Sequence, residues 1–166
     1  MKVAIIFYSF SGNTKSACLF LKGSLNSNGI AADSIELKPL REERSFFQQG
    51  RQAFRKHMPL LADVTYDLAA YDFVVFASPV WAFTIAPALR SYLKKAKGLE
   101  NKKTACFVTH GSGLGSKKAL RELEEILKSC GARILCAKDI AGNKAKDCFC
   151  MEENFKSFID IVTARP

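Results

Sequence analysis

The fold prediction for this sequence starts from the stretch KVAIIFYSFSGNT, residues 2–14. Its apolar run, Val3 to Tyr8, is rich in branched and aromatic residues, which is typical of a strand buried on both faces. A short polar loop follows at once and leads into a helical pattern. A strand that turns directly into a helix brings free backbone N–H groups and the positive end of the helix dipole to one place. That place suits an anion.

The loop at residues 9–14 offers hydrogen-bond donors that carry no charge. Its polar side chains belong to Ser9, Ser11, Asn13 and Thr14. Gly12 allows a close approach of the backbone, and the P-loop pattern with its lysine is absent. Two interpretations stay open: a phosphate site made of neutral donors, and an ordinary strand–helix turn with Asn13 or Ser11 as the N-cap.

Length, composition and charge narrow the class of protein. A chain of 166 residues with 48% hydrophobic residues predicts one domain, residues 1–166, with a substantial core. No apolar stretch is long enough to span a bilayer and no signal peptide is recognisable, so we expect a cytoplasmic protein with free thiols. The net charge of +9 favours acidic partners or phosphorylated small molecules. Nucleic-acid binding is disfavoured, because no zinc-finger, basic-heptad or RNA-binding signature occurs.

Apolar periodicity and turn residues predict an alternation of five strands and helices, with no internal repeat. The expected strands are residues 3–8, 32–37, 73–77, 104–109 and 133–140. The expected helices are residues 14–28, 86–96, a helix from Ser116 as N-cap to near Gly131 that buries Leu120, Leu123, Ile126 and Leu127, and 152–162. Such an order argues for a parallel sheet with helices on both faces.

Two segments have several interpretations. The basic stretch from Arg41 to Lys56, which continues to Pro59, suggests a short amphipathic helix with a solvated charged face, or a basic rim beside a site. Cys148 and Cys150 form a Cys-x-Cys pair without the further ligands that zinc or an iron–sulfur cluster needs. We therefore expect structural or incidental thiols there, and no metal site.

Polar, glycine-rich or aromatic loops follow the first, third and fourth expected strands. These loops contain SFSGNT (9–14), SPVWAF (78–83) and THGSG (109–113). In a parallel sheet, loops at the carboxyl ends of the strands gather at one edge, where ligands bind. Their coincidence predicts a single site more strongly than any one loop does.

With these motifs assembled, the chain resembles the flavodoxin family of FMN-binding proteins over essentially its whole length. The resemblance implies an α/β, flavodoxin-like fold with a five-stranded parallel sheet in the order 2-1-3-4-5. It also implies FMN as cofactor, bound by three loops. Their residues are Ser9, Phe10, Ser11, Gly12, Asn13 and Thr14 for the phosphate, Ser78, Pro79, Val80, Trp81, Ala82 and Phe83 beside the flavin ring, and Thr109, His110, Gly111, Ser112 and Gly113 at its pyrimidine edge.

The single tryptophan and the loop histidine each have an alternative role. Trp81 is expected to contact the flavin, and the alternative that this interpretation outweighs is a core or surface anchor. His110 is either a satisfied loop histidine or a group that tunes the reduced flavin. The loop HGSGLGS matches the glycine-rich dinucleotide-binding fingerprint only in part, because its last glycine is misplaced. No aspartate ends the third strand as a receiver domain requires, and no Cys-x5-Arg phosphatase motif occurs.

The resemblance leaves the choice between enzyme and carrier open. Flavodoxins are acidic around the flavin, whereas this chain is basic and its third loop carries a histidine and no carboxylate. Positive surroundings stabilise an anionic reduced flavin. We therefore expect an FMN-dependent oxidoreductase that uses NAD(P)H or quinone-like partners, with a flavodoxin-type carrier that docks on a redox protein as the alternative. An FMN-free interaction domain is a third class, and the sequence predicts no oligomeric state.

Overall fold

Residues 1–40 and 58–163 are described by the computed structural model of the chain. The elements in these residues are β1 (Lys2–Phe7), α1 (Asn13–Ser27), β2 (Ala31–Glu36), β3 (Phe73–Trp81), β4 (Thr84–Ile85), α3 (Pro87–Lys95), β5 (Lys103–His110), α4 (Ser116–Ser129), β6 (Arg133–Ala141), the 3-10 turn η1 (Gly142–Lys144) and α5 (Cys148–Thr163). The basic stretch from Arg41 to Lys56 lies outside the described residues, so the expectation of a helix there stays a prediction.

The sheet has the strand order β2-β1-β3-β5-β6, and all four neighbouring pairs are parallel. Since β5 and β6 are the fourth and fifth strands of the sequence analysis, the expected order 2-1-3-4-5 is confirmed. β4 is an additional short strand that pairs antiparallel with the end of β3. The sheet is thus extended by one arm of a hairpin that the sequence did not predict.

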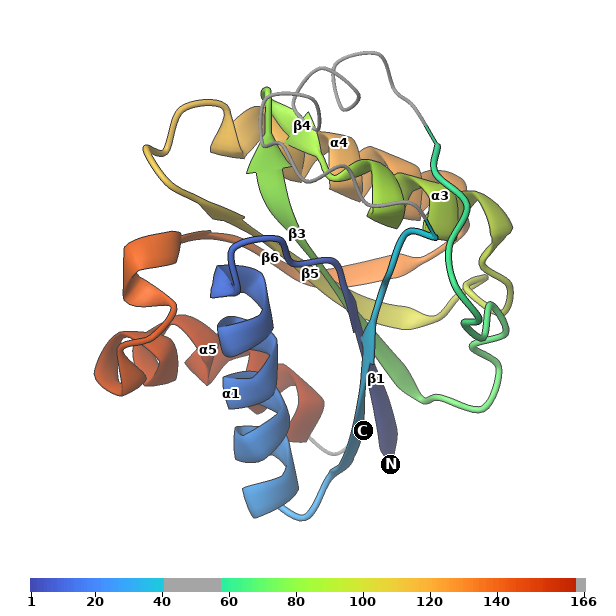
Figure 1. The fold of residues 1–166 in the computed structure, drawn as a ribbon. Coiled ribbons are helices and arrows are strands. Elements are labelled where there is room, and N and C mark those ends of the chain that lie inside the picture. Colours follow the sequence, from blue (N-terminus) through green and yellow to red (C-terminus); the bar gives the residue numbers. More distant parts are fainter. Residues whose placement is uncertain (41–57, 164–166) are drawn as a thin grey trace.

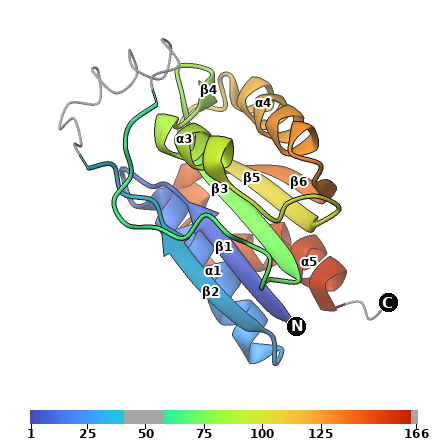
Figure 2. The ribbon, with the colours of Figure 1, turned by 90° about the vertical axis from the view of Figure 1, so that its right-hand side faces the viewer.

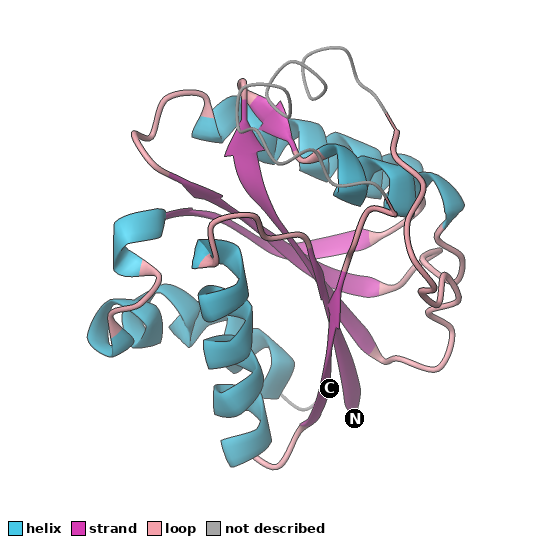
Figure 3. Ribbon diagram, viewed as in Figure 1, coloured by secondary structure: helices cyan, strands magenta, loops and turns pink. Residues whose placement is uncertain are grey.

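Helices cover both faces of the sheet (Figures 1 and 2). α1 and α5 lie on one face, and α3 and α4 lie on the other (Figure 3). Side chains alternate along each strand, so β1 supplies both apolar layers. Val3, Ile5 and Phe7 pack in the layer with α1 and α5, whereas Ala4 and Ile6 pack in the layer with α3 and α4. Such a doubly covered strand explains why the first apolar run of the sequence lacks alternation.

Several boundaries differ from the expected ones, and each difference has a local cause. β3 continues past Ala77 to Trp81, because the chain reverses after Trp81 and Thr84–Ile85 pairs back onto it. α5 begins at Cys148 and not at Glu152, so Cys148 and Cys150 lie in its first turn. In α4, Ala119, Leu123 and Leu127 are buried, while Leu120 and Ile126 are only partly covered.

The N-cap of α4 is also corrected. Gly115 is the cap, in the left-handed conformation with φ 79°, and Ser116 is the first helical residue. The side chain of Ser116 bonds elsewhere, to a carboxylate of β6, which only the tertiary structure brings near. All six cysteines are free thiols. Across residues 1–40 and 58–163, no helix is long and apolar enough to cross a membrane.

Candidate functional site

The loops at the carboxyl end of the sheet touch one another through a small number of close contacts. The loop after β1 and the end of β5 are joined by a hydrogen bond between two threonines. Phe10 of the first loop packs edge-on against Trp81 of β3. Gly115 of the β5–α4 loop lies against Phe83 of the β3–β4 turn. The three predicted loops therefore lie together at one edge, as the sequence analysis expects of a parallel sheet.

The first loop leaves the amino end of α1 without a side-chain cap. Gly12 occupies the N-cap position with φ 88°, and no side chain caps the helix there, so neither Asn13 nor Ser11 is the cap. The hydroxyl of Ser9 accepts a hydrogen bond from the backbone N–H of Lys15 at 3.2 Å. Its own proton is therefore available to a further acceptor. An uncapped helix start with adjacent hydroxyls retains the chemistry of an anion site.

Thr14 is buried at 1% exposure, and its Oγ1 lies 2.7 Å from Oγ1 of Thr109. One of the two hydroxyls donates and the other accepts. The donor hydroxyl keeps its acceptor lone pairs, and the acceptor hydroxyl keeps its proton. The bond couples the first and third predicted loops across β1, β3 and β5. Direct phosphate contact by Thr14 stays a prediction, and the structure adds a positional role to it.

The first cation after this loop in the sequence, Lys15, is paired with a carboxylate. Lys15 Nζ lies 2.8 Å from Glu36 Oε2 at the end of β2. Both side chains are partly exposed, so this pair contributes little to stability. The consequence of this ion pair is electrostatic: the charge of Lys15 is largely balanced, and the loop itself offers an anion neutral donors and the helix dipole.

Most of the second predicted loop, residues 78–81, belongs to strand β3. Ser78 is fully buried, and its hydroxyl accepts from the Ala86 N–H at 2.8 Å and donates to the Pro79 carbonyl at 2.9 Å. Its side chain thus holds the start of α3 and has no exposed surface toward a ligand. Pro79 and Val80 continue β3 and are partly exposed.

Trp81 is 5% exposed and belongs to the core on the α3–α4 face. Its ring makes edge contacts with Tyr8, at a centroid distance of 5.8 Å, and with Phe10, at 5.6 Å. In the structure Trp81 is therefore a core residue, which was the alternative in the sequence analysis. Phe10 and Phe83, at 38% and 46% exposure, are the aromatic side chains that the two loops present at the surface.

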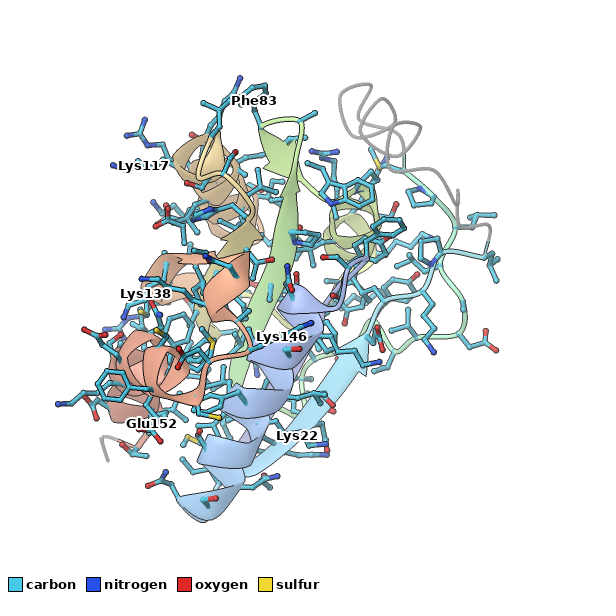
Figure 4. All side chains as sticks on the ribbon, turned by 60° about the vertical axis from the view of Figure 1, so that its left-hand side comes forward. Lys22, Phe83, Lys117, Lys138, Lys146 and Glu152 are labelled. Carbon is cyan, nitrogen blue, oxygen red and sulfur yellow. The ribbon has the colours of Figure 1, made fainter. Side chains whose placement is uncertain are left out.

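The turn between β3 and β4 holds two non-glycine residues at positive φ. Ala82 has φ 45° and Phe83 has φ 66°, as a two-residue turn of type I′ requires. A Cβ at Gly115 would lie 2.4 Å from Cδ1 of Phe83, so the absence of a side chain at Gly115 lets Phe83 pack there. Figure 4 shows Phe83 and Lys117, near the start of α4, at the same end of the molecule.

An ion pair between a buried arginine and a partly buried glutamate holds this turn against α3 and α4. Arg90 Nη2 lies 2.6 Å from Glu122 Oε1 and donates to the Thr84 hydroxyl at 2.6 Å. Thr84 in turn donates to Glu122, whose Oε2 also accepts the Ile85 N–H. Burial raises the pKa of Glu122, but the hydrogen bonds from Thr84 and Arg90 and the charge of Arg90 outweigh it and hold the pKa below its ordinary value.

The third loop contains a carboxylate in space although it has none in sequence. Oδ2 of Asp139, from β6, lies 3.7 Å from Nε2 of His110 and accepts a hydrogen bond from Ser116 Oγ at 2.8 Å. The sequence argument from a loop without negative charge therefore has to be corrected. The parallel register of β5 and β6 brings Asp139 opposite Val108, beside the loop.

A fourth segment, the turn after β6, completes the edge and was not predicted. A Cβ at Gly142 would lie 2.7 Å from Asn13 Nδ2 and 3.3 Å from the His110 carbonyl. Gly142 therefore lies against both the first and the third predicted loops. The sequence signal for this segment was a glycine directly after the fifth expected strand, because the other site loops also follow the carboxyl ends of strands.

These features fit FMN. The uncapped start of α1 and the hydroxyl of Ser9 suit a phosphate, and Phe10 and Phe83 are exposed aromatic surfaces at the same edge. Residues 1–40 and 58–163 contain no group of three or more metal-ligating side chains. The neutral donors beside exposed aromatic rings suit an organic phosphate ligand.

Comparison with solved structures identifies the fold. The chain is similar to a flavoprotein from Lactobacillus acidophilus NCFM, crystallised with FMN, with 20% identity over 83% of this chain and 92% of that chain and a TM-score of 0.69. It is also similar to a flavodoxin from the domain Archaea, at 14% identity, 96% and 99% coverage and a TM-score of 0.63. Flavodoxin 2 of Bacillus cereus matches at 20% identity, 93% and 100% coverage and a TM-score of 0.60. No curated protein matches.

The fold and the assembled loops define an FMN-binding flavoprotein of flavodoxin-like architecture. Residues 1–147 match the family model of the NADPH-dependent FMN reductases. The match covers most of the 166 residues, and the chain belongs to the NADPH-dependent FMN reductase family. The predicted cofactor, FMN, is thereby confirmed.

Proposed function

We propose that this protein is an FMN-dependent NAD(P)H oxidoreductase that passes electrons to a quinone-like or other electrophilic acceptor. The observation that carries the proposal is the match of residues 1–147 to a family of NADPH-dependent reductases. When bound, FMN supplies two-electron transfer between the nicotinamide and the acceptor. The protein supplies binding, orientation and electrostatics.

In this proposal the first loop and the start of α1 hold the phosphate. The donors are the hydroxyls of Ser9 and Ser11, the amide of Asn13 and the first N–H groups of the helix. Thr14 supports this loop through its hydrogen bond with Thr109. Hydrogen bonds to a charged group contribute roughly 1.5–3 kcal/mol each, so four of them supply a large part of the affinity before the costs of association.

His110 and Phe83 have proposed roles beside the flavin ring. His110 stands at the end of β5, where its imidazole favours the reduced and more negative form of the flavin. Phe83 offers an exposed ring at 46% exposure on a turn that Arg90 and Glu122 fasten. The net charge of +9 attracts the phosphates of a nicotinamide nucleotide over long distances.

The decisive experiment is anaerobic mixing of the FMN-loaded protein with NADH and with NADPH. Bleaching of the flavin absorbance by either nucleotide, followed by its recovery with a quinone, is the expected result. Retention of the flavin band through gel filtration establishes FMN as a bound cofactor and separates this case from turnover of free FMN. A flavin that binds tightly and never bleaches with NAD(P)H would contradict the proposal.

A second candidate is an electron carrier of the flavodoxin type, which the fold likeness to flavodoxins favours. In that case dithionite reduces the bound flavin, both nicotinamide nucleotides leave it unchanged, and a redox protein accepts its electrons. The same mixing experiment therefore decides between the two candidates.

A further inference from the structure

The direction of the Asp139 side chain is fixed by its place in β6. Its neighbour Lys138 donates to the Asn154 carbonyl of α5 at 2.7 Å and so lies on the α5 side of the sheet, as Figure 4 shows. Successive side chains of a strand alternate, and Asp139 accordingly extends toward α4. There the hydroxyl of Ser116, which is 3% exposed, donates to its Oδ2 at 2.8 Å.

The same oxygen faces the imidazole of His110. Oδ2 lies 3.7 Å from Nε2, and the histidine side chain is 14% exposed. Nδ1 is buried and has no hydrogen-bond partner among residues 1–40 and 58–163. The ring is also close to Gly113, whose added Cβ would lie 3.7 Å from Cε1. One nitrogen thus faces a carboxylate, while the other makes no hydrogen bond within the described residues.

We propose that Asp139 is a positioning residue for His110: held by Ser116, its carboxylate fixes the orientation of the imidazole, with the proton on Nε2. This inference rests on the role proposed above for His110 toward reduced FMN. A bare Nδ1 costs less in a buried place than an unpaired N–H donor would, which agrees with the proton on Nε2. The pair of His110 and Asp139, and not the histidine alone, then determines how this loop acts on the flavin.

The dependence of an Asp139 substitution on His110 separates this role from a simple charge effect. If the carboxylate acts directly on the flavin, its removal takes away a negative charge and strengthens the binding of reduced FMN relative to oxidised FMN, with or without His110. If it acts through His110, its removal releases the imidazole, and the change in relative binding is lost when His110 is absent.

The first test observes the imidazole without FMN. The chain has two histidines, so His57→Gln leaves His110 as the single imidazole signal in a long-range 1H–15N spectrum. We expect the neutral ring to carry its proton on Nε2 and to lose this preference in Asp139→Ala and in Ser116→Ala. A tautomer preference that survives both substitutions would overturn the proposal, whatever the protein does with FMN or NAD(P)H.

The second test is a double-mutant cycle on the affinities for oxidised and dithionite-reduced FMN. Asp139→Ala should change the ratio of the oxidised to the reduced dissociation constant by roughly 1.5- to fivefold, the range expected for one partly exposed charge contact. It should have no further effect in the His110→Ala background. An equal effect with and without His110 would show that Asp139 acts directly on the flavin and would overturn the proposal.

Asp160→Ala is the matched control. It removes one exposed carboxylate from α5, on the other face of the sheet, and so changes the net charge equally. We expect it to leave both the imidazole signal and the affinity ratio unchanged. Asp139→Asn serves as the second variant if Asp139→Ala fails to fold.

Discussion

Oγ1 of Thr14, in the first turn of α1, lies 2.7 Å from Oγ1 of Thr109 near the end of β5, and both residues are buried. The two hydroxyls form a direct polar link between the predicted phosphate loop and the predicted pyrimidine loop. Thr109 faces α1, whereas its neighbour His110 faces Asp139 on the α4 side. The end of β5 thus contacts a different part of the site on each face of the sheet.

Thr109→Val should destabilise the protein and weaken FMN binding. The substitution removes one partner of the pair and leaves the buried Thr14 hydroxyl unsatisfied, which costs roughly 1–3 kcal/mol. Urea unfolding of the apoprotein and FMN titration measure the two effects. If stability is unchanged, the two hydroxyls do not depend on each other.

The double variant Thr14→Val with Thr109→Val tests whether Thr14 only supports the loop or also contacts the phosphate. Replacing both hydroxyls with apolar groups of the same shape should restore most of the stability, because no buried hydroxyl remains unsatisfied. FMN affinity should recover with it if Thr14 only supports the loop. Persistent loss of affinity would indicate that the Thr14 hydroxyl itself contacts the phosphate.

Gly142→Ala should weaken FMN binding by disturbing Asn13. The added methyl would lie 2.7 Å from Asn13 Nδ2, so either the amide or the turn after β6 has to move. Gly23→Ala is the control, since nothing lies within 4 Å of its Cβ and alanine favours the interior of a helix by about 1 kcal/mol. We expect the control to be more stable with unchanged FMN affinity. Equal affinities of all three proteins would exclude the turn from the site.

Glu122→Gln should reduce stability at neutral pH and reduce it less in acid. The pKa of Glu122 is lowered in the folded protein from an ordinary value of 4.5, so its contribution is present above that value and is lost as pH falls through the folded pKa. The difference in unfolding free energy between the two proteins should be constant above about pH 5.5, one unit above the ordinary pKa, and should shrink below pH 4.5. A difference that stays constant down to pH 3 would contradict this linkage.

Ala82→Asn should stabilise the hairpin. Ala82 has φ 45°, a conformation that costs most L-residues roughly 1–2 kcal/mol and that asparagine adopts more readily. Thermal unfolding should show a higher midpoint. The converse control is Asn101→Ala, at a position with φ 54°, which should lower the midpoint. If both substitutions shift it in the same direction, backbone strain does not explain either effect.

Local patterns in the sequence were enough to predict the framework. The apolar run from Val3 to Tyr8 predicts a doubly buried strand, and Pro87 marks the start of α3. Alternation of strands and helices then leads to a parallel sheet with loops at one edge. These features depend on residues close in sequence, which is why they are readable without a structure.

The β3–β4 hairpin and the burial of Trp81 could not be predicted from local sequence patterns. β4 has two residues, too few to give a periodic signal. Trp81 lies in the core because Tyr8 and Phe10, about seventy residues earlier, pack against it. An aromatic residue directly after a strand has the same local pattern whether it is exposed or covered.

The sequence by itself determined the fold class and FMN as the ligand that the motifs imply, and it predicts an anion site at the loop of residues 9–14. The tertiary structure decided which groups stand beside those motifs: Thr109 beneath Thr14, Asp139 beside His110 and Gly142 against Asn13. The physical reason is that parallel strands bring together residues that are 29 or more positions apart in these three pairs. The partner of a hydroxyl or an imidazole is then fixed by strand register and side-chain direction, neither of which is encoded locally.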